Sequence, residues 1–139
     1  DMIRSYLYIL LVKASRFAEP GATGDACRRS LILGRRFKSL LEENFGTLQD
    51  AAGYARMMRV TERTLNQATR QSLGSTAAQL IRERVMLEAK RLLAHSGVSV
   101  NEVARQLAFD DPAYFSRCFK KCTGRTPLEF RQTVSRLGA

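Results

Sequence analysis

The apolar residues of this chain recur at helical spacing from Leu31 onward. They return every three or four residues in a series of short segments, and turn or capping residues separate one segment from the next. No stretch alternates between apolar and polar residues with the period of two that a half-buried strand shows. The pattern therefore predicts an all-α fold of about seven helices, preceded by a further amphipathic helix near the start of the chain.

Capping residues and glycines delimit the expected helices. The long segment in the middle, over about residues 77–95, carries one apolar stripe and predicts a single helix of five turns. The expected caps at helix starts are Thr47, Thr61, Thr76, Ser99, Asp111 and Thr126, and the expected stops are Gly46, Gly74, His95 to Gly97, and Gly124.

Residues 1–17 form a short heptad pattern. The seam consists of Ile3, Leu7, Leu10, Ala14 and Phe17. Such a helix either packs on its own domain or pairs with a second copy as a dimer seam, and two and a half heptads do not decide between these alternatives. Residues 18–29 contain one proline and two glycines and predict a linker. The folded domain is expected to occupy residues 30–139.

The apolar run at residues 6–12 (YLYILLV) is too short to cross a bilayer, which takes about 20 residues. It lacks the cleavage pattern of a signal peptide, and the three cysteines fit a reducing cytoplasm better than a disulfide framework. The chain begins at Asp1 within an expected helix, which suggests a fragment of a longer protein.

The composition is strongly basic. Lys and Arg number 23 against 13 Asp and Glu, so the formal net charge is +10. This excess favours a polyanionic partner, nucleic acid before a membrane surface. The charge is spread along the chain instead of gathered in a tail, so folded surfaces must present it.

An internal repeat indicates which folded surfaces present the basic charge. Two copies of about 25 residues lie 49 to 50 residues apart, and each reads helix, tight turn, capped helix, glycine stop. The matched positions are Ala55 with Ala104, Val60 with Phe109, Thr61 with Asp111, Leu65 with Phe115, Gly74 with Gly124, and Thr76 with Thr126. A small residue in the first helix lets the second cross it closely, as in a helix-turn-helix unit. The two units are expected at about residues 48–74 and 99–123.

At these residues the sequence resembles the DNA-binding domain of the AraC/XylS family of bacterial transcription regulators. Residues 99–131 look like the family signature over the second unit, including the Phe-x-Arg-x-Phe-Lys pattern from Phe115 to Lys120, and the likeness covers about residues 31–136. The resemblance implies a homodimer through residues 1–17, RNA polymerase as a partner, and an effector bound by a domain upstream of Asp1. The family usually has glycine where Ala108 stands, and a small or turn-forming residue where Arg59 stands, so both turns depart from its pattern.

The outward faces of the second helix in each unit carry the candidate base readers. Arg pairs bidentately with guanine and Asn or Gln with adenine, whereas a small residue can only contact a thymine methyl group. The candidates, which match the base-facing positions of the family, are Arg63, Asn66 and Gln67 in the first unit and Ala113, Tyr114 and Arg117 in the second. Phosphate contacts are expected from side chains and helix N-termini at Arg70, Thr76, Lys120, Lys121, Arg125 and Thr126.

The sequence contains few residues that could form a catalytic or metal-binding site. Cys118 and Cys122 lie four residues apart but no other ligands accompany them, so we interpret both as buried apolar residues with no metal. There is no Gly-rich phosphate loop, no nucleophile with a supporting base and no cofactor motif, so no enzyme is expected.

The sequence therefore predicts a sequence-specific, double-stranded DNA-binding transcription regulator, a ligand-responsive activator in the cytoplasm with no membrane partner. Two alternatives stay open: a helical adaptor that binds the transcription machinery, and an architectural DNA binder without sequence preference.

Overall fold

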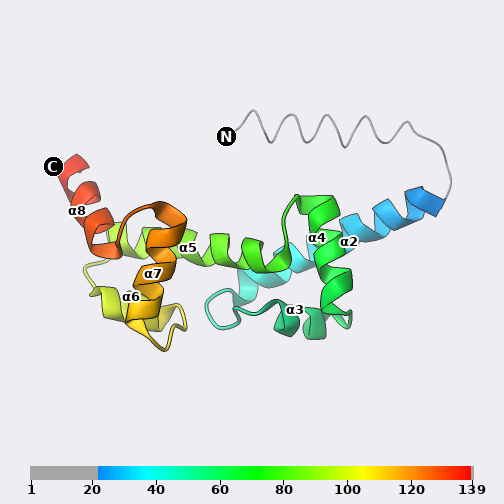
Figure 1. The fold of residues 1–139 in the computed structure, drawn as a ribbon, viewed down its shortest axis with the longest axis horizontal. Helices are drawn as coiled ribbons and strands as arrows, with labels where there is room; N and C mark the ends of the chain where they lie inside the picture. The colour runs from blue at the N-terminus through cyan, green and yellow to red at the C-terminus, as the bar shows by residue number, and fades with distance from the viewer. Residues whose placement is uncertain (1–21, 139) are drawn as a thin grey trace.

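A computed structural model of the protein describes residues 22–138, which form seven α-helices and no strand (Figure 1). The helices are α2 (Ala22–Asn44), α3 (Ala51–Met58), α4 (Glu62–Leu73), α5 (Ala77–His95), α6 (Val100–Gln106), α7 (Pro112–Thr123) and α8 (Pro127–Leu137). The predicted all-α fold with two helix-turn-helix units on a long central helix is confirmed. The predicted seam at residues 1–17 lies outside the described residues.

Helix α2 begins earlier than the sequence suggested. The prediction of a linker over residues 18–29 is wrong for residues 22–29, which are the first turns of α2. Residues 24–29 are all exposed, and this end of α2 extends away from the other helices (Figure 1). One glycine costs a helix only about 1 kcal/mol, which the packed remainder of α2 can offset. Residues 18–21 lie outside the described part of the chain.

Helix α2 lies against α4 at a very close crossing. A Cβ atom on Gly34 would lie 2.0 Å from Oγ of Ser72, so only glycine fits at this point. One turn earlier, Ser30 is buried and its hydroxyl donates a hydrogen bond of 2.5 Å to Oε1 of Gln71. The contact continues into the core through Phe37, which meets Tyr54 of α3 edge-on at 5.4 Å between ring centres.

The predicted caps are present at five helices. Thr61, Thr76, Ser99, Asp111 and Thr126 each accept a hydrogen bond from a backbone N–H of the helix that follows.

The cap of α3 differs from the expectation of Thr47. Asp50 caps this helix, and its Oδ1 accepts from the N–H of Gly53 at 2.6 Å. Leu48, which precedes this cap, packs so closely over Gly53 that a Cβ there would lie 2.6 Å from its Cδ1.

Helix α5 is the centre of the molecule. Figure 1 shows α4 and α7 standing across it at opposite ends, with α3 beside α4 and α6 beside α7. Its buried residues Ile81, Val85 and Ala89 lie in one core with Leu65 of α4 and Phe115 of α7. At its C-terminal end, the guanidinium of Arg131 donates to the carbonyls of Leu93 and Val98 and so attaches α8. A domain in which α5 serves both units should fold as one core.

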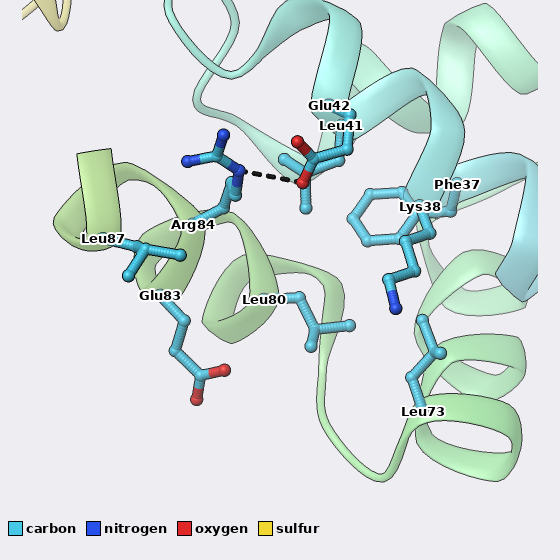
Figure 2. A pocket seen from close by; sticks show the side chains of 9 residues that line it. All are labelled: Phe37, Lys38, Leu41, Glu42, Leu73, Leu80, Glu83, Arg84 and Leu87. Atoms are coloured by element: carbon cyan, nitrogen blue, oxygen red, sulfur yellow. Dashed lines mark hydrogen bonds and ion pairs between the residues drawn. The ribbon is translucent and has the colours of Figure 1, made fainter. Parts of the chain in front are cut away.

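A groove runs between α2, the end of α4 and α5, and Figure 2 shows it from close by. Its walls include the apolar side chains of Leu41, Leu80 and Leu87. Arg84 spans it, since its Nε donates to Oε1 of Glu42 at 2.8 Å and its guanidinium carbon lies 3.9 Å from the centre of the Phe45 ring. This bridge fastens α2 to α5. Within residues 22–138, no helix is long and apolar enough to cross a membrane.

The two turns of the repeat have the same unusual backbone. Arg59 (φ 56°) and Ala108 (φ 59°) both adopt the left-handed region, and each lies between the two helices of its unit. Each turn is closed by a hydrogen bond to the small residue of the first helix, from Val60 N–H to Ala55 O at 3.0 Å and from Phe109 N–H to Ala104 O at 2.9 Å. Arg59 and Ala108, the two residues that depart from the family pattern, are therefore positions of backbone strain, because a residue with a Cβ is disfavoured in the left-handed region.

Replacing Ala108 with glycine should stabilise the protein by about 0.5–1 kcal/mol, because relief of the left-handed strain outweighs the greater freedom of glycine in the unfolded chain. Thermal unfolding followed by circular dichroism should show a midpoint raised by about 2–3 °C. Ala78 is the matched control, since it is exposed within α5. There the same substitution should destabilise by about 0.5–1 kcal/mol. Equal losses at both positions would contradict the strain at Ala108.

Candidate DNA interface

Helix α4 presents a polar face to solvent. Arg63 and Gln67 are exposed on it, while Leu65 and Ala68 are buried against the core. Thr61 caps the helix through its hydroxyl, which accepts from the N–H of Thr64 at 3.1 Å. Arg63 makes no ion pair with another described residue, so its guanidinium is available to a ligand. The face thus offers a bidentate donor and an amide on the outer side of one helix.

Asn66 differs from its predicted role as a bidentate adenine reader. Its side chain is half-buried, and Oδ1 accepts a hydrogen bond of 3.0 Å from the backbone N–H of Ala77 at the start of α5. A bidentate contact with adenine needs that oxygen, so it would break a bond within the protein. Asn66 therefore connects α4 to α5 by a hydrogen bond. No local pattern in the sequence indicated this connection.

Helix α7 presents the second face. Ala113, Tyr114 and Arg117 are exposed, whereas Phe115 and Phe119 are buried. The guanidinium of Arg117 lies 3.9 Å from the Asp111 carboxylate and 5.9 Å from the centre of the Tyr114 ring. Both contacts are long and solvent-exposed, so they orient Arg117 without holding it away from a ligand.

Tyr114 is fixed from its inner side. Its ring lies 6.1 Å from that of Phe109 in the turn, between ring centres. A side-chain hydrogen bond with the Cys118 thiol raises the pKa of Tyr114, so the hydroxyl stays protonated at neutral pH and can act as donor or acceptor.

The two cysteines of α7 differ from each other. Cys118 is half-buried and packs against the core, but Cys122 is exposed, so the interpretation of both as buried residues is wrong for Cys122. Position 122 lies on the last turn of α7, where the helix already extends past the core. Within the described residues, no three His, Cys, Asp or Glu side chains gather in a way that could hold a metal ion.

Four of the six predicted phosphate-binding residues carry exposed cationic side chains, namely Arg70, Lys120, Lys121 and Arg125. Arg125 is oriented by α8, since its Nη1 donates to the Thr133 hydroxyl at 3.0 Å. At Thr76, the N-terminus of α5 has no acidic residue in its first turn, so its positive end can face a phosphate.

The N-terminus of α8, where a phosphate contact was predicted at Thr126, already holds an acidic side chain of the protein. Glu129 forms a complete capping box there, and its Oε2 accepts from the backbone N–H of Thr126 at 2.9 Å. These hydrogen bonds with Thr126 lower the pKa of Glu129, so its carboxylate remains charged where a phosphate would bind. The Thr-x-x-Glu spacing is a local signal in the sequence that could have identified this cap.

The separation of the two faces is set by α5. This helix has 19 residues, which corresponds to about 28 Å of length at the usual helical rise. Successive turns of the major groove on one side of a duplex are about 34 Å apart. The length of α5, which carries the two polar helix faces at its opposite ends, is thus close to this spacing.

Comparison with known proteins identifies this arrangement. Residues 54–133 match the family model described as a helix-turn-helix domain. The chain is 30% identical over 123 residues to the HTH-type transcriptional activator RhaR of Cronobacter sakazakii, and covers 42% of that protein and 88% of its own length. It is 37% identical over 92 residues to the arabinose operon regulatory protein of Escherichia coli, covering 66% of this chain and 30% of the relative. The chain belongs to the AraC/XylS family.

Solved structures agree with the AraC-type fold. The C-terminal domain of AraT, a response regulator from Geobacillus stearothermophilus, aligns with a TM-score of 0.68 and 27% identity over 73% of this chain and 84% of that one. An AraC-type regulator from Chromobacterium violaceum shares the fold at a TM-score of 0.65 and 22% identity, over 77% of this chain and 93% of that one.

The AraC/XylS family consists of DNA-binding transcription regulators and not of enzymes. The chain spans less than half the length of the two curated relatives it matches.

Proposed function

We propose that this protein recognises specific double-stranded DNA by inserting α4 and α7 into successive major grooves of one duplex. The observation that carries the proposal is the placement of two exposed polar helix faces at opposite ends of α5, each backed by a buried apolar face. Arg63 and Gln67 are the proposed readers on α4, and Tyr114 and Arg117 on α7, with a thymine methyl contact from Ala113.

The proposed phosphate contacts surround these two faces. They come from Arg70, Lys120, Lys121 and Arg125 and from the N-terminus of α5 at Thr76. The formal net charge of +10 supports a sizeable salt-dependent contribution to binding. The Asn66 amide is left out of the proposed contacts because its oxygen already accepts from Ala77, and the N-terminus of α8 is left out because the charged Glu129 carboxylate lies there.

Selection of bound sequences from random duplex DNA tests the function. We expect an enriched site with two conserved segments about one helical turn apart. A competition between that site and random duplex then separates the alternatives. An architectural binder would show affinity without discrimination, and an adaptor of the transcription machinery would show no salt-sensitive affinity for DNA.

Arg63→Ala and Arg117→Ala should each weaken binding to the selected site by about 1–3 kcal/mol and relax the preference at one base position. Lys121→Ala should instead weaken all sequences alike and lower the slope of log K against log salt by about one. Titrations at several salt concentrations, with the selected site and with random duplex, measure both effects. A base-selective loss in Lys121→Ala, or uniform losses in both arginine variants, would reverse these assignments.

We further propose that residues 1–17 pair with a second copy, so that the protein acts as a homodimer. The heptad seam supports this, and the exposed N-terminal turns of α2 leave room for it beyond the packed domain. Changing Leu7 and Leu10 together to Asp should yield monomers at micromolar concentration by sedimentation, with the helicity of residues 31–136 kept. Persistent dimers would place the interface elsewhere, and a large loss of helicity would favour packing of the seam on its own domain.

We also propose that the protein is an activator, as the relative RhaR is by its name, and that it acts in the cytoplasm through contact with RNA polymerase. The match to less than half of those relatives also supports an effector domain outside this sequence. Transcription from a promoter that carries the selected site, measured with and without this protein, tests the sign of regulation.

A further inference from the structure

The two helix-turn-helix units meet directly at one polar contact away from the axis of α5. Nε2 of Gln49, in the segment before α3, donates a hydrogen bond to the carbonyl oxygen of Leu107, at the end of α6. Within the described part of the chain, no other hydrogen bond or ion pair joins residues 22–74 to residues 98–138. The two units are thus connected twice, once through α5 and once through this hydrogen bond.

The donor side of this contact is held firmly by its neighbours in the chain. The carbonyl of Leu48 accepts a hydrogen bond of 2.9 Å from the hydroxyl of Tyr54, whose side chain is fully buried. Burial raises the pKa of Tyr54 to about 12, so this hydroxyl stays a donor. On the other side, the Asp50 carboxylate caps α3. Gln49 therefore extends from a segment that is fixed to the first unit.

The acceptor side belongs to the turn of the second unit. Leu107 is 2% exposed and forms the C-cap of α6, with its N–H bonded to Val103 O at 3.1 Å. Carbonyls at the end of a helix have no partner within that helix, and the Gln49 amide supplies one for Leu107. The left-handed residue Ala108 follows at once and leads into α7. A displacement of Leu107 would therefore displace the second recognition helix.

Apolar packing does not fill the space beside this contact. A cavity of about 160 Å³ lies there on the surface of α5, bordered by Gln49 of the first unit and by Phe109 and Tyr114 of the second. With an open space beside α5, the Gln49 bond is the contact placed to restrict rotation of one unit against the other.

We propose that Gln49 is a positioning residue that fixes the orientation of α7 relative to α4, and thereby the spacing between two DNA half-sites that the protein accepts. The inference rests on the proposed function, because it requires both helices to enter one duplex. Gln49 itself touches no base; it acts on the second recognition helix through Leu107.

The experiment uses the full chain and duplexes in which the two selected half-sites are moved apart or together by one and two base pairs. Each base pair changes the separation by about 3.4 Å and the rotation by about 34°. The wild type should lose on the order of 10-fold in affinity for each one-base-pair change. Gln49→Met keeps the length of the side chain but removes the donor, and should lose no more than about 3-fold.

Two further measurements separate orientation from damage to either unit. Gln49→Met should bind duplexes that contain only one half-site within about twofold of the wild type, because each reading face is unchanged. Gln106→Met is the matched control on α6, since the Gln106 side chain is exposed and bonds only within its own helix, to Glu102 at 3.1 Å. That variant should keep the spacing dependence of the wild type.

The outcomes distinguish this inference from the function on which it rests. A wild type that depends on spacing, together with a Gln49→Met variant that depends on it equally, overturns the inference and leaves the proposed function standing. A wild type that binds all spacings alike overturns the tandem function and the inference together. Loss of binding to single half-sites by Gln49→Met overturns the positioning role, because the residue would then support a reading face directly.

Discussion

Replacing Phe115 with alanine is expected to lower the free energy of unfolding by about 3–5 kcal/mol. Its side chain is fully buried in α7 and meets Phe109 at 5.1 Å and Phe119 at 6.0 Å, between ring centres. Removing the ring leaves a cavity where α6, α7 and the turn between them converge. Urea unfolding followed by circular dichroism measures the loss, which is a large part of the stability of a domain of this size.

Tyr114→Ala is the matched control for this substitution, because the two aromatic residues are adjacent on α7. Tyr114 is 54% exposed, so its removal should cost under about 1 kcal/mol in stability. It should instead weaken binding to the selected DNA site. A Tyr114→Ala variant that loses as much stability as Phe115→Ala would contradict the assignment of an inner and an outer face to α7.

Inserting four helix-forming residues into α5 after Leu87 is expected to lower the affinity for the selected DNA site by at least about 100-fold. The insertion lengthens the helix by about 6 Å and turns the second unit by about 40°. Leu87 is 61% exposed, and the insertion leaves the Arg84 bridge to Glu42 on its original side. It separates Gln49 from Leu107 and prevents α7 from entering the groove next to that of α4.

Footprinting should show protection that shrinks from two adjacent major grooves to one, while non-specific affinity and helicity are largely kept. Four residues inserted after Ser96 serve as the control, because they lengthen the loop between α5 and α6 next to the exposed Gly97 and leave the register of α5 unchanged. Protection of both grooves with undiminished affinity in the α5 variant would show that α5 is a flexible tether.

The outward faces of α4 and α7 were predictable because they depend on periodicity within one helix. Leu65 and Phe115 occupy equivalent positions in the two copies, and both are fully buried, which leaves their polar neighbours outside. Residues three and four apart share a helix face whatever the rest of the fold does. The caps at Thr61 and Asp111 follow from the same locality, since each needs only a side-chain acceptor and the next few N–H groups.

The start of α2 and the exposure of Cys122 were not predictable in this way. A glycine and a proline near residue 22 are typical of a linker, but the helix extends back from the part of α2 that packs on α4. Cys122 shares the helix face of Cys118, yet that face continues past the end of the core into solvent. Periodicity gives the direction of a side chain and not the extent of the surface that covers it.

By itself, the sequence determined the helices and the residues that face outward on α4 and α7, because both depend on spacing over fewer than about 20 residues. It also determined the repeat and the family, because both depend on the likeness of motifs. The tertiary structure decided how these faces relate to each other. The bond of Asn66 to Ala77 joins residues 11 positions apart, and that of Gln49 to Leu107 joins residues 58 apart. Neither has a periodic signal, because such pairs form only once the packing of α5 against both units has brought the chain segments together.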